Sequence, residues 1–91
     1  PILVFAPRRK ASEDLAKQLA LALPPCEPIS LTRQQRELAD EALLKLLAKG
    51  VAYHHSGLPY SARAGLVEPL AKAGALRVVV CTMGLSSGIN F

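Results

Sequence analysis

Three short apolar runs, separated by stretches of helical character, constrain the fold of this chain more than any other feature. The runs cover Ile2–Ala6, Val51–Tyr53 and Leu76–Cys81. Each is short and is bounded by Pro, Gly or polar residues, a pattern typical of buried β-strands. Two helical segments lie between the first two runs, and one lies between the last two. Because strands that alternate with helices form parallel sheets, the sequence predicts an α/β fold in the order β-α-α-β-α-β.

A first helix is predicted to begin at Ser12, a residue type that caps helix starts, and to end at about Leu23. The prolines at positions 24 and 25 stop it, because proline disfavours helical geometry in the residue before it. Its apolar face is predicted from residues spaced four apart, namely Leu15, Leu19 and Leu23.

A second helix is predicted to open with a capping box formed by Thr32 and Gln35 and to run to about Leu47. Its predicted apolar stripe consists of Leu38, Ala42, Leu43, Leu46 and Leu47. A third helix is predicted over 59–73. Pro69 should kink that helix, since it removes a backbone donor from the helix interior.

The composition limits the chain to one small domain or part of one. Its 91 residues are 51% apolar and 20% charged, which excludes a disordered chain. Lys and Arg outnumber Asp and Glu by 11 to 7, and the resulting net charge of +4 permits a nucleic-acid partner without requiring one. With two Tyr, two Phe and no Trp, a surface that binds bases chiefly on aromatic rings is not expected.

The sequence carries no signal for export or membrane insertion. It has no signal peptide and no run of the roughly 20 apolar residues that a membrane-spanning helix needs. Its two cysteines, Cys26 and Cys81, are too few for a disulfide framework, so we expect reduced thiols and a cytoplasmic location. Pro1 leads directly into a strand and Phe91 follows no closing element, so residues 1–91 are expected to be part of a larger domain.

Polar and basic segments follow each of the three predicted strands. They are Pro7-Arg8-Arg9-Lys10, His54-His55-Ser56-Gly57 and the segment from Thr82 to Gly88. Because parallel strands share one carboxyl edge, these segments should meet there. Guanidinium, hydroxyl and backbone N–H groups at one edge suit phosphate, and they suit a nucleic-acid backbone better than a base sequence.

Each segment alone also has an ordinary interpretation. The basic run at 8–10 is compatible with a solvated loop, and the segment 82–88 with a tight turn. Adjacent side chains of an extended segment point to opposite sides, so one of His54 and His55 is expected to be packed or hydrogen-bonded. No Cys or carboxylate is spaced to complete a zinc site with them.

Two further patterns are excluded by what they lack. The run Gly84-Leu85-Ser86-Ser87-Gly88 matches the nucleophile elbow of hydrolases, but no His or acid follows it. Cys81 precedes a Ser- and Gly-containing loop as a phosphatase nucleophile does. Ser87, however, occupies the position of the arginine that would bind phosphate.

Taken together, the three edge segments resemble superfamily-2 helicases, specifically the superkiller-type DExH branch. The segment from Leu3 to Ala16 resembles motif IV, although Pro7 stands where a Ser or Thr usually precedes the basic residue. The segment from Gly50 to Pro59 resembles the branch's "GVxxHHxGL" pattern. Val78 to Phe91 resembles motif V. Three motifs in the right order and spacing cover nearly the whole chain.

The resemblance implies a partial second RecA-like domain, a three-layer α/β unit spanning residues 1–91 and incomplete at its C-terminus. It implies an ATP-dependent helicase that binds single-stranded or partially duplex RNA or DNA, with ATP and Mg²⁺ between this domain and a first RecA-like domain. The residues that it assigns to nucleic-acid binding are Arg8, Arg9, His55, Gly57, Thr82 and Met83. Gly88 and Asn90 are assigned to the ATP cleft.

The chain contains no G-x-x-x-x-G-K-[ST] loop and no acidic metal-binding motif. We therefore expect no catalytic residue, no metal ligand and no bound cofactor in this segment, which should be inactive alone. One alternative is a small α/β domain that binds NADP or another phosphorylated small molecule through its basic edge. It lacks the G-x-G-x-x-G turn after the first strand. A protein-interaction module is a second alternative, and no large apolar patch supports it.

Overall fold

The computed structural model describes residues 1–82 and confirms the α/β class. Its strands are β1 (Ile2–Ala6), β2 (Val51–His54) and β3 (Val78–Thr82). Between β1 and β2 lie α1 (Arg9–Ala22), α2 (Arg33–Leu38) and α3 (Glu41–Leu47). Between β2 and β3 runs a continuous helical stretch made of α4 (Tyr60–Ala62), the π-helical turn η1 (Arg63–Val67) and α5 (Glu68–Lys72).

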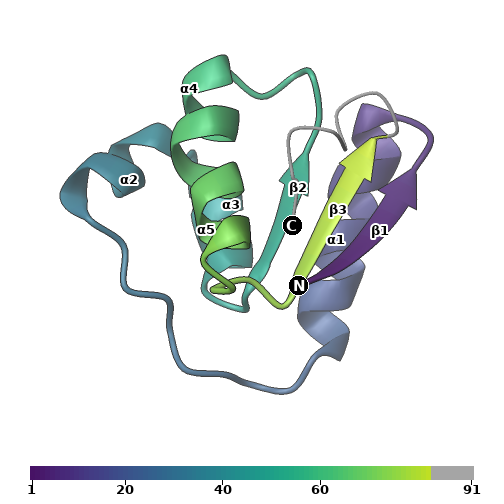
Figure 1. Ribbon diagram of the computed structural model, residues 1–91. Helices are drawn as coiled ribbons and strands as arrows, with labels where there is room; N and C mark the ends of the chain where they lie inside the picture. Colours follow the sequence, from purple (N-terminus) through teal and green to yellow (C-terminus); the bar gives the residue numbers. More distant parts are fainter. Residues whose placement is uncertain (83–91) are drawn as a thin grey trace.

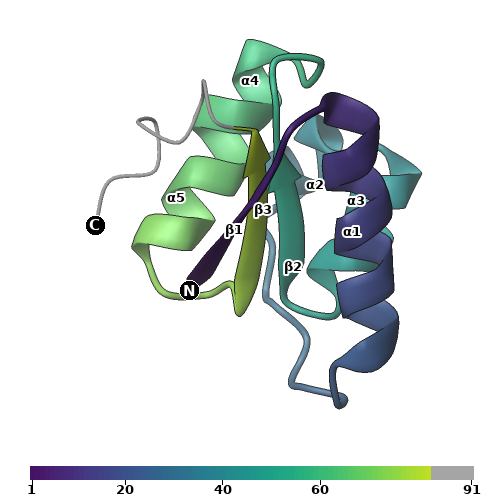
Figure 2. The same cartoon turned by 90° about the vertical axis from the view of Figure 1, so that its right-hand side faces the viewer.

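The three strands form a parallel sheet in the order β1-β3-β2, so the strand made last in sequence lies in the middle (Figure 1). Helices α1 and α3 cover one face of the sheet, and the α4–η1–α5 stretch covers the other (Figure 2). The predicted three-layer architecture is therefore confirmed. The core lies on both faces of β2 and β3, and its most deeply buried large side chains include Leu43, Leu47, Leu66, Val67 and Val79.

The face of α1 that meets the sheet differs from the predicted one. Its buried residues are Ser12, Ala16 and Ala20, while Leu15 and Leu19 are only partly buried. Small side chains along this line let the helix axis approach the sheet closely, and the leucines fill its flanks. The helix begins at Arg9, so Ser12 does not cap it; the Ser12 hydroxyl instead donates to the carbonyl of Arg9 at 2.6 Å.

The predicted helix over 32–47 is two helices. The capping box is confirmed, since Thr32 Oγ1 accepts from the N–H of Gln35 and Gln35 Oε1 accepts from the N–H of Thr32. The backbone then turns extended at Ala39, and Asp40 caps α3 by accepting from the N–H of Leu43 at 2.8 Å. A second N-cap inside the apolar pattern breaks the helix, because it offers the backbone a competing hydrogen bond.

Strand β1 is not the buried strand that its apolar sequence predicts. Among the described residues it lies at an edge of the sheet, and Ile2 and Phe5 are 67% and 48% exposed. An apolar run of five residues does not distinguish a central strand from an edge strand, because the neighbour of a strand is set by the whole topology.

Pro69 is accommodated by the π-helical turn immediately before it. The N–H of Glu68 bonds the carbonyl of Arg63, five residues earlier, and Pro69 then occupies the first turn of α5. Proline is tolerated at such a position since its missing N–H has no helical partner to lose. The sequence predicted a kink here, and the structure shows a widened turn in its place. Leu66, Val67, Leu70 and Ala71 are buried on the side of this stretch that faces the sheet.

Candidate nucleic-acid interface

The carboxyl edge of the sheet brings together residues from all three strand ends. An open hollow of about 490 Å³ lies there, lined among the described residues by Pro7, Arg8, Arg9, Lys10, Ser56 and Thr82. Cationic side chains thus enter from the β1–α1 loop, and hydroxyl groups enter from the loop after β2 and from the end of β3. This combination of charge and hydroxyl donors is what a phosphate group requires.

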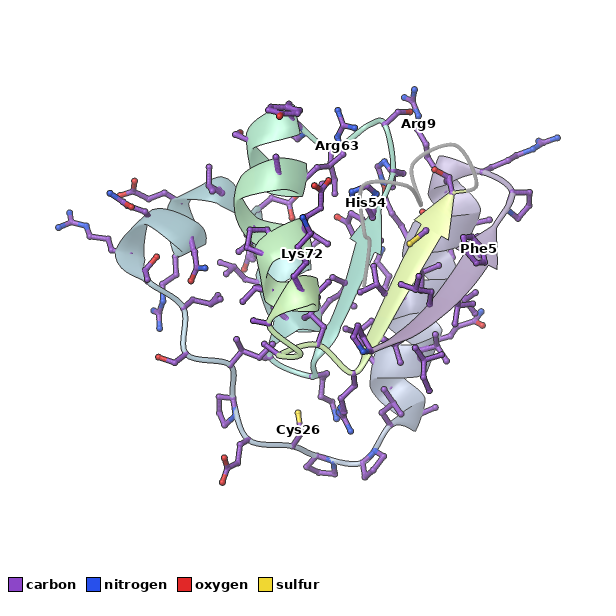
Figure 3. All side chains as sticks on the ribbon, viewed as in Figure 1. Phe5, Arg9, Cys26, His54, Arg63 and Lys72 are labelled. Carbon is purple, nitrogen blue, oxygen red and sulfur yellow. The ribbon has the colours of Figure 1, made fainter. Side chains whose placement is uncertain are left out.

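Arg8 and Arg9 are exposed, and within residues 1–82 neither forms an ion pair. Arg9 extends from the start of α1 at the carboxyl end of the sheet (Figure 3). Lys10, by contrast, pairs with Asp14 one turn along α1 at 3.6 Å. The two arginines therefore carry the uncompensated positive charge of the hollow.

His55 is buried, with 4% of its surface exposed, and its ring is held on three sides. Nε2 lies 2.7 Å from Glu13 Oε2, and Nδ1 accepts from the N–H of Gly57 at 2.9 Å. The ring also stacks on Tyr53, with centroids 5.1 Å apart. Because Nδ1 accepts a bond, the proton resides on Nε2 and is donated to Glu13. His55 thus fixes the turn that follows β2, and its predicted contact with a nucleic acid stays a prediction.

Gly57 is required by close approach. A Cβ atom at this position would lie 2.9 Å from Cε1 of His55 and 3.3 Å from Cδ of Arg9. The aliphatic part of Arg9 therefore packs against the same turn that His55 holds through its bond from the N–H of Gly57. Only a residue without a side chain leaves room for both contacts.

His54 repeats the arrangement on the opposite face of the sheet. It is 1% exposed, and its Nε2 lies 2.8 Å from Glu68 Oε2 of α5. Its Nδ1 is buried without a partner among the described residues. Both histidines are thus packed and hydrogen-bonded, where the sequence predicted this for one. The end of β2 is fastened to α1 by Glu13 and to α5 by Glu68, two residues that the sequence analysis missed.

Thr82 ends β3, pairs in register with Ala6 and is partly buried at the rim of the hollow. Cys81, one residue earlier, is fully buried, and burial raises the pKa of its thiol from 9.0 to about 11. Burial, with smaller contributions from Asp40 and Glu13, raises the pKa of Tyr53 to about 12. Both groups are neutral at physiological pH, which agrees with the exclusion of Cys81 as a nucleophile.

Three of the predicted site residues, Met83, Gly88 and Asn90, lie outside the described residues, as does the serine run at 84–88. Within residues 1–82, the His, Cys, Asp and Glu side chains form no group of three or more that could hold a metal ion. In the same part of the chain no helix has the length and apolar character needed to cross a membrane.

Comparison with known proteins gives relatives that cover nearly the whole chain. The chain is 32% identical over 89 residues to the ATP-dependent DNA helicase Hel308 of Thermoplasma volcanium. This alignment covers 98% of the chain. It is 38% identical over 96 residues to Hel308 of Pyrococcus horikoshii, spanning 97% of the chain. It is 33% identical over 110 residues to DNA polymerase theta of Drosophila melanogaster, spanning 98%. No protein-family model matches the chain.

The chain therefore belongs to the superfamily-2 helicases. The chain spans 13% of the length of each Hel308 relative and 5% of DNA polymerase theta. The three-layer parallel fold of residues 1–82 is compatible with part of a RecA-like domain.

Proposed function

We propose that this chain is part of the second RecA-like domain of an ATP-dependent helicase and that its carboxyl edge binds the phosphate backbone of single-stranded DNA. The observation that carries the proposal is the hollow in which Arg8, Arg9, Ser56 and Thr82 converge. Two unpaired guanidinium groups beside hydroxyl donors suit a polyanion and offer little that distinguishes one base from another. DNA is chosen over RNA because the Hel308 relatives are named DNA helicases.

Within this proposal the residues have distinct roles. Arg8 and Arg9 bind phosphates by charge, and Thr82 donates its hydroxyl to a phosphate. Gly57 lets the stem of Arg9 pack against the turn beside the strand. His55 acts by holding that turn. Met83 is assigned to the same strand, and the superkiller-type branch remains our interpretation of the segment from Gly50 to Pro59.

We include ATP because the Hel308 relatives are named ATP-dependent, and Mg²⁺ because it neutralises the transferred phosphate in such reactions. Residues 1–82 contain neither a triphosphate-binding loop nor an acidic metal-binding motif, so they do not fit the nucleotide by themselves. We assign Gly88 and Asn90 to the ATP cleft, which the first RecA-like domain would complete. We also propose a cytoplasmic, that is intracellular, location, since free thiols and a nucleic-acid substrate suit a reducing compartment.

The test is Arg9→Ala in the full-length protein that contains this chain. Binding to a labelled single strand, measured by fluorescence anisotropy at several salt concentrations, should weaken for every base sequence. The slope of log affinity against log salt should shrink by about 1, because one phosphate contact is lost. Lys72→Ala is the matched control, since Lys72 is an exposed cation at the end of α5, next to the opposite edge of the sheet.

An unchanged affinity and slope in Arg9→Ala would contradict the proposal. The alternative of a phosphorylated small-molecule site predicts a different result. Arg9→Ala would then weaken the binding of NADP and leave the binding of single-stranded DNA unchanged.

A further inference from the structure

Tyr60 is an aromatic residue left uncovered beside the proposed backbone-binding edge. Its surface is 75% exposed, although it begins helix α4 and its neighbours Leu58 and Ala62 are buried. The guanidinium carbon of Arg63 lies 5.9 Å from the centroid of its ring. A guanidinium at this distance over an aromatic face is a cation–π contact. Arg63 therefore contacts one face of the ring, while most of the ring remains exposed to solvent.

The ring and the guanidinium are both held in place by the loop that follows β2. Arg63 Nε donates to the carbonyl of Leu58 at 3.3 Å, and Leu58 is 8% exposed. Pro59 precedes Tyr60 and has its φ fixed by its own ring. The position of the aromatic ring is thus tied to the buried loop that also contains His55 and Gly57.

This pair lies at the same end of the sheet as the hollow. Arg63 and Arg9 both extend at the carboxyl end of the strands, one from the α4–η1 side and the other from the α1 side (Figure 3). The loop from His55 to Leu58 joins the two positions. Tyr60 and Arg63 do not line the hollow itself, but a strand that leaves it past Ser56 and follows this loop reaches the helix that begins with Tyr60.

We propose that Tyr60, supported by Arg63, is a stacking site for one nucleobase of the strand whose backbone occupies the neighbouring hollow. The proposal rests on the proposed function and adds a base-binding residue to it. Every base has an aromatic face, so the site accepts any sequence, and stacking on one ring is expected to contribute about tenfold to affinity. Arg63 lies over one face of the ring, which leaves the opposite face for the base.

The test compares two strands with the same phosphates in the full-length protein that contains this chain. One is a labelled oligothymidylate and the other is a labelled strand of abasic units of equal length. For each variant, the dissociation constant for the abasic strand is divided by that for oligothymidylate. This ratio measures how much the bases contribute to binding. Tyr60→Ala and Tyr60→Leu should each lower this ratio about tenfold, whereas Tyr60→Phe should retain it, since a phenyl ring also stacks.

The control variant is Leu21→Ala, which removes another exposed apolar side chain, 85% exposed on α1, and should leave the ratio unchanged. Tyr60→Ala should also leave the salt slope unchanged, because no phosphate contact is removed. Equal weakening on both strands, or no weakening in Tyr60→Ala, would overturn the stacking site. Failure of the proposed function has a different signature, namely an unchanged affinity and salt slope in Arg9→Ala.

Discussion

Gly57 lies between two side chains that fix the candidate interface, and it explains why a glycine follows the histidine pair. Replacing it by Ala would bring a methyl group within 2.9 Å of the His55 ring, which Glu13 and Tyr53 prevent from moving away. We expect Gly57→Ala to lower the free energy of unfolding by about 1–3 kcal/mol, a typical cost of overpacking. Chemical denaturation measures this change.

Gly65→Ala provides the comparison. Among residues 1–82, its methyl group would meet Cδ1 of Leu38, at 3.0 Å, which is the far end of a flexible side chain on α2. Alanine also favours helix over glycine by about 1 kcal/mol, so the net change should be near zero. Equal destabilisation by both substitutions would show that the His55 ring does not determine the cost at Gly57.

Cys81 should be unreactive in the folded protein until the pH is strongly alkaline. Burial raises the pKa of its thiol from 9.0 to about 11, so the reactive thiolate forms in the folded state only near that value. The unfolded chain ionises first, so the contribution of Cys81 to stability falls as the pH rises from about 9 to about 11.

Alkylation with iodoacetamide, quantified peptide by peptide, measures this difference. The exposed Cys26 should be modified at pH 8 while Cys81 is not. Modification of Cys81 should rise as the pH approaches 11. Similar rates for the two cysteines at pH 8 would contradict the burial of Cys81.

Helix α3 depends on its own cap, because it is only seven residues long. Asp40 supplies the acceptor for the N–H of Leu43, and its carboxylate also lies at the positive end of the helix dipole. Asp40→Ala should lower the free energy of unfolding by about 1 kcal/mol, as N-cap substitutions do. Asp40→Ser should retain most of the stability, since a hydroxyl can accept the same bond. Thermal unfolding of the two variants distinguishes a capping role from a charge effect, which would make both equally unstable.

The two histidine–glutamate pairs join the three layers of the molecule at one point of β2. Glu13→Ala would leave Nε2 of His55 buried without a partner, and Glu68→Ala would do the same to His54. Each should lower the free energy of unfolding by about 1–3 kcal/mol. Glu13→Ala should also weaken single-strand binding, since His55 holds the turn beneath Arg9.

Glu68→Ala acts from the other face of the sheet and should affect binding less at matched stability. Denaturation and anisotropy on the same preparations separate the two effects. An equal loss of binding in both variants would argue that the turn responds to overall stability and not to the position of His55.

How far the sequence predicts the molecule depends on the range of the interaction. The three strands and the capping box of Thr32 follow from local patterns, and the structure confirms them. Of the polar segments, it brings Arg8, Arg9, Ser56 and Thr82 to one edge, and the rest of the third segment lies outside the described residues. The pairing of His55 with Glu13 spans 42 residues and that of His54 with Glu68 spans 14. No local spacing relates these residues, so neither pair could be predicted.

The burial of β1 was predicted wrongly, and the small residues by which α1 meets the sheet were missed, for a related reason; the predicted leucines of α1 pack against the core but are only partly buried. An apolar run such as Ile2–Ala6 shows that a strand forms, but the number of its neighbours depends on where β3 inserts. Likewise Leu15 and Leu19 are more apolar than Ser12 and Ala16, yet the smaller pair faces the sheet because the helix must lie close to it.

The strand order β1-β3-β2 affects how the chain can fold while it is being synthesised on the ribosome. Within residues 1–82, the strands that β1 and β2 pair with are in both cases β3, which is synthesised after them. Until Val78–Thr82 has emerged, the two earlier strands have unpaired backbones and nothing to join them. A nascent chain that stops before that segment therefore exposes two unpaired strands, and synthesis of the five residues of β3 supplies the partner that joins them.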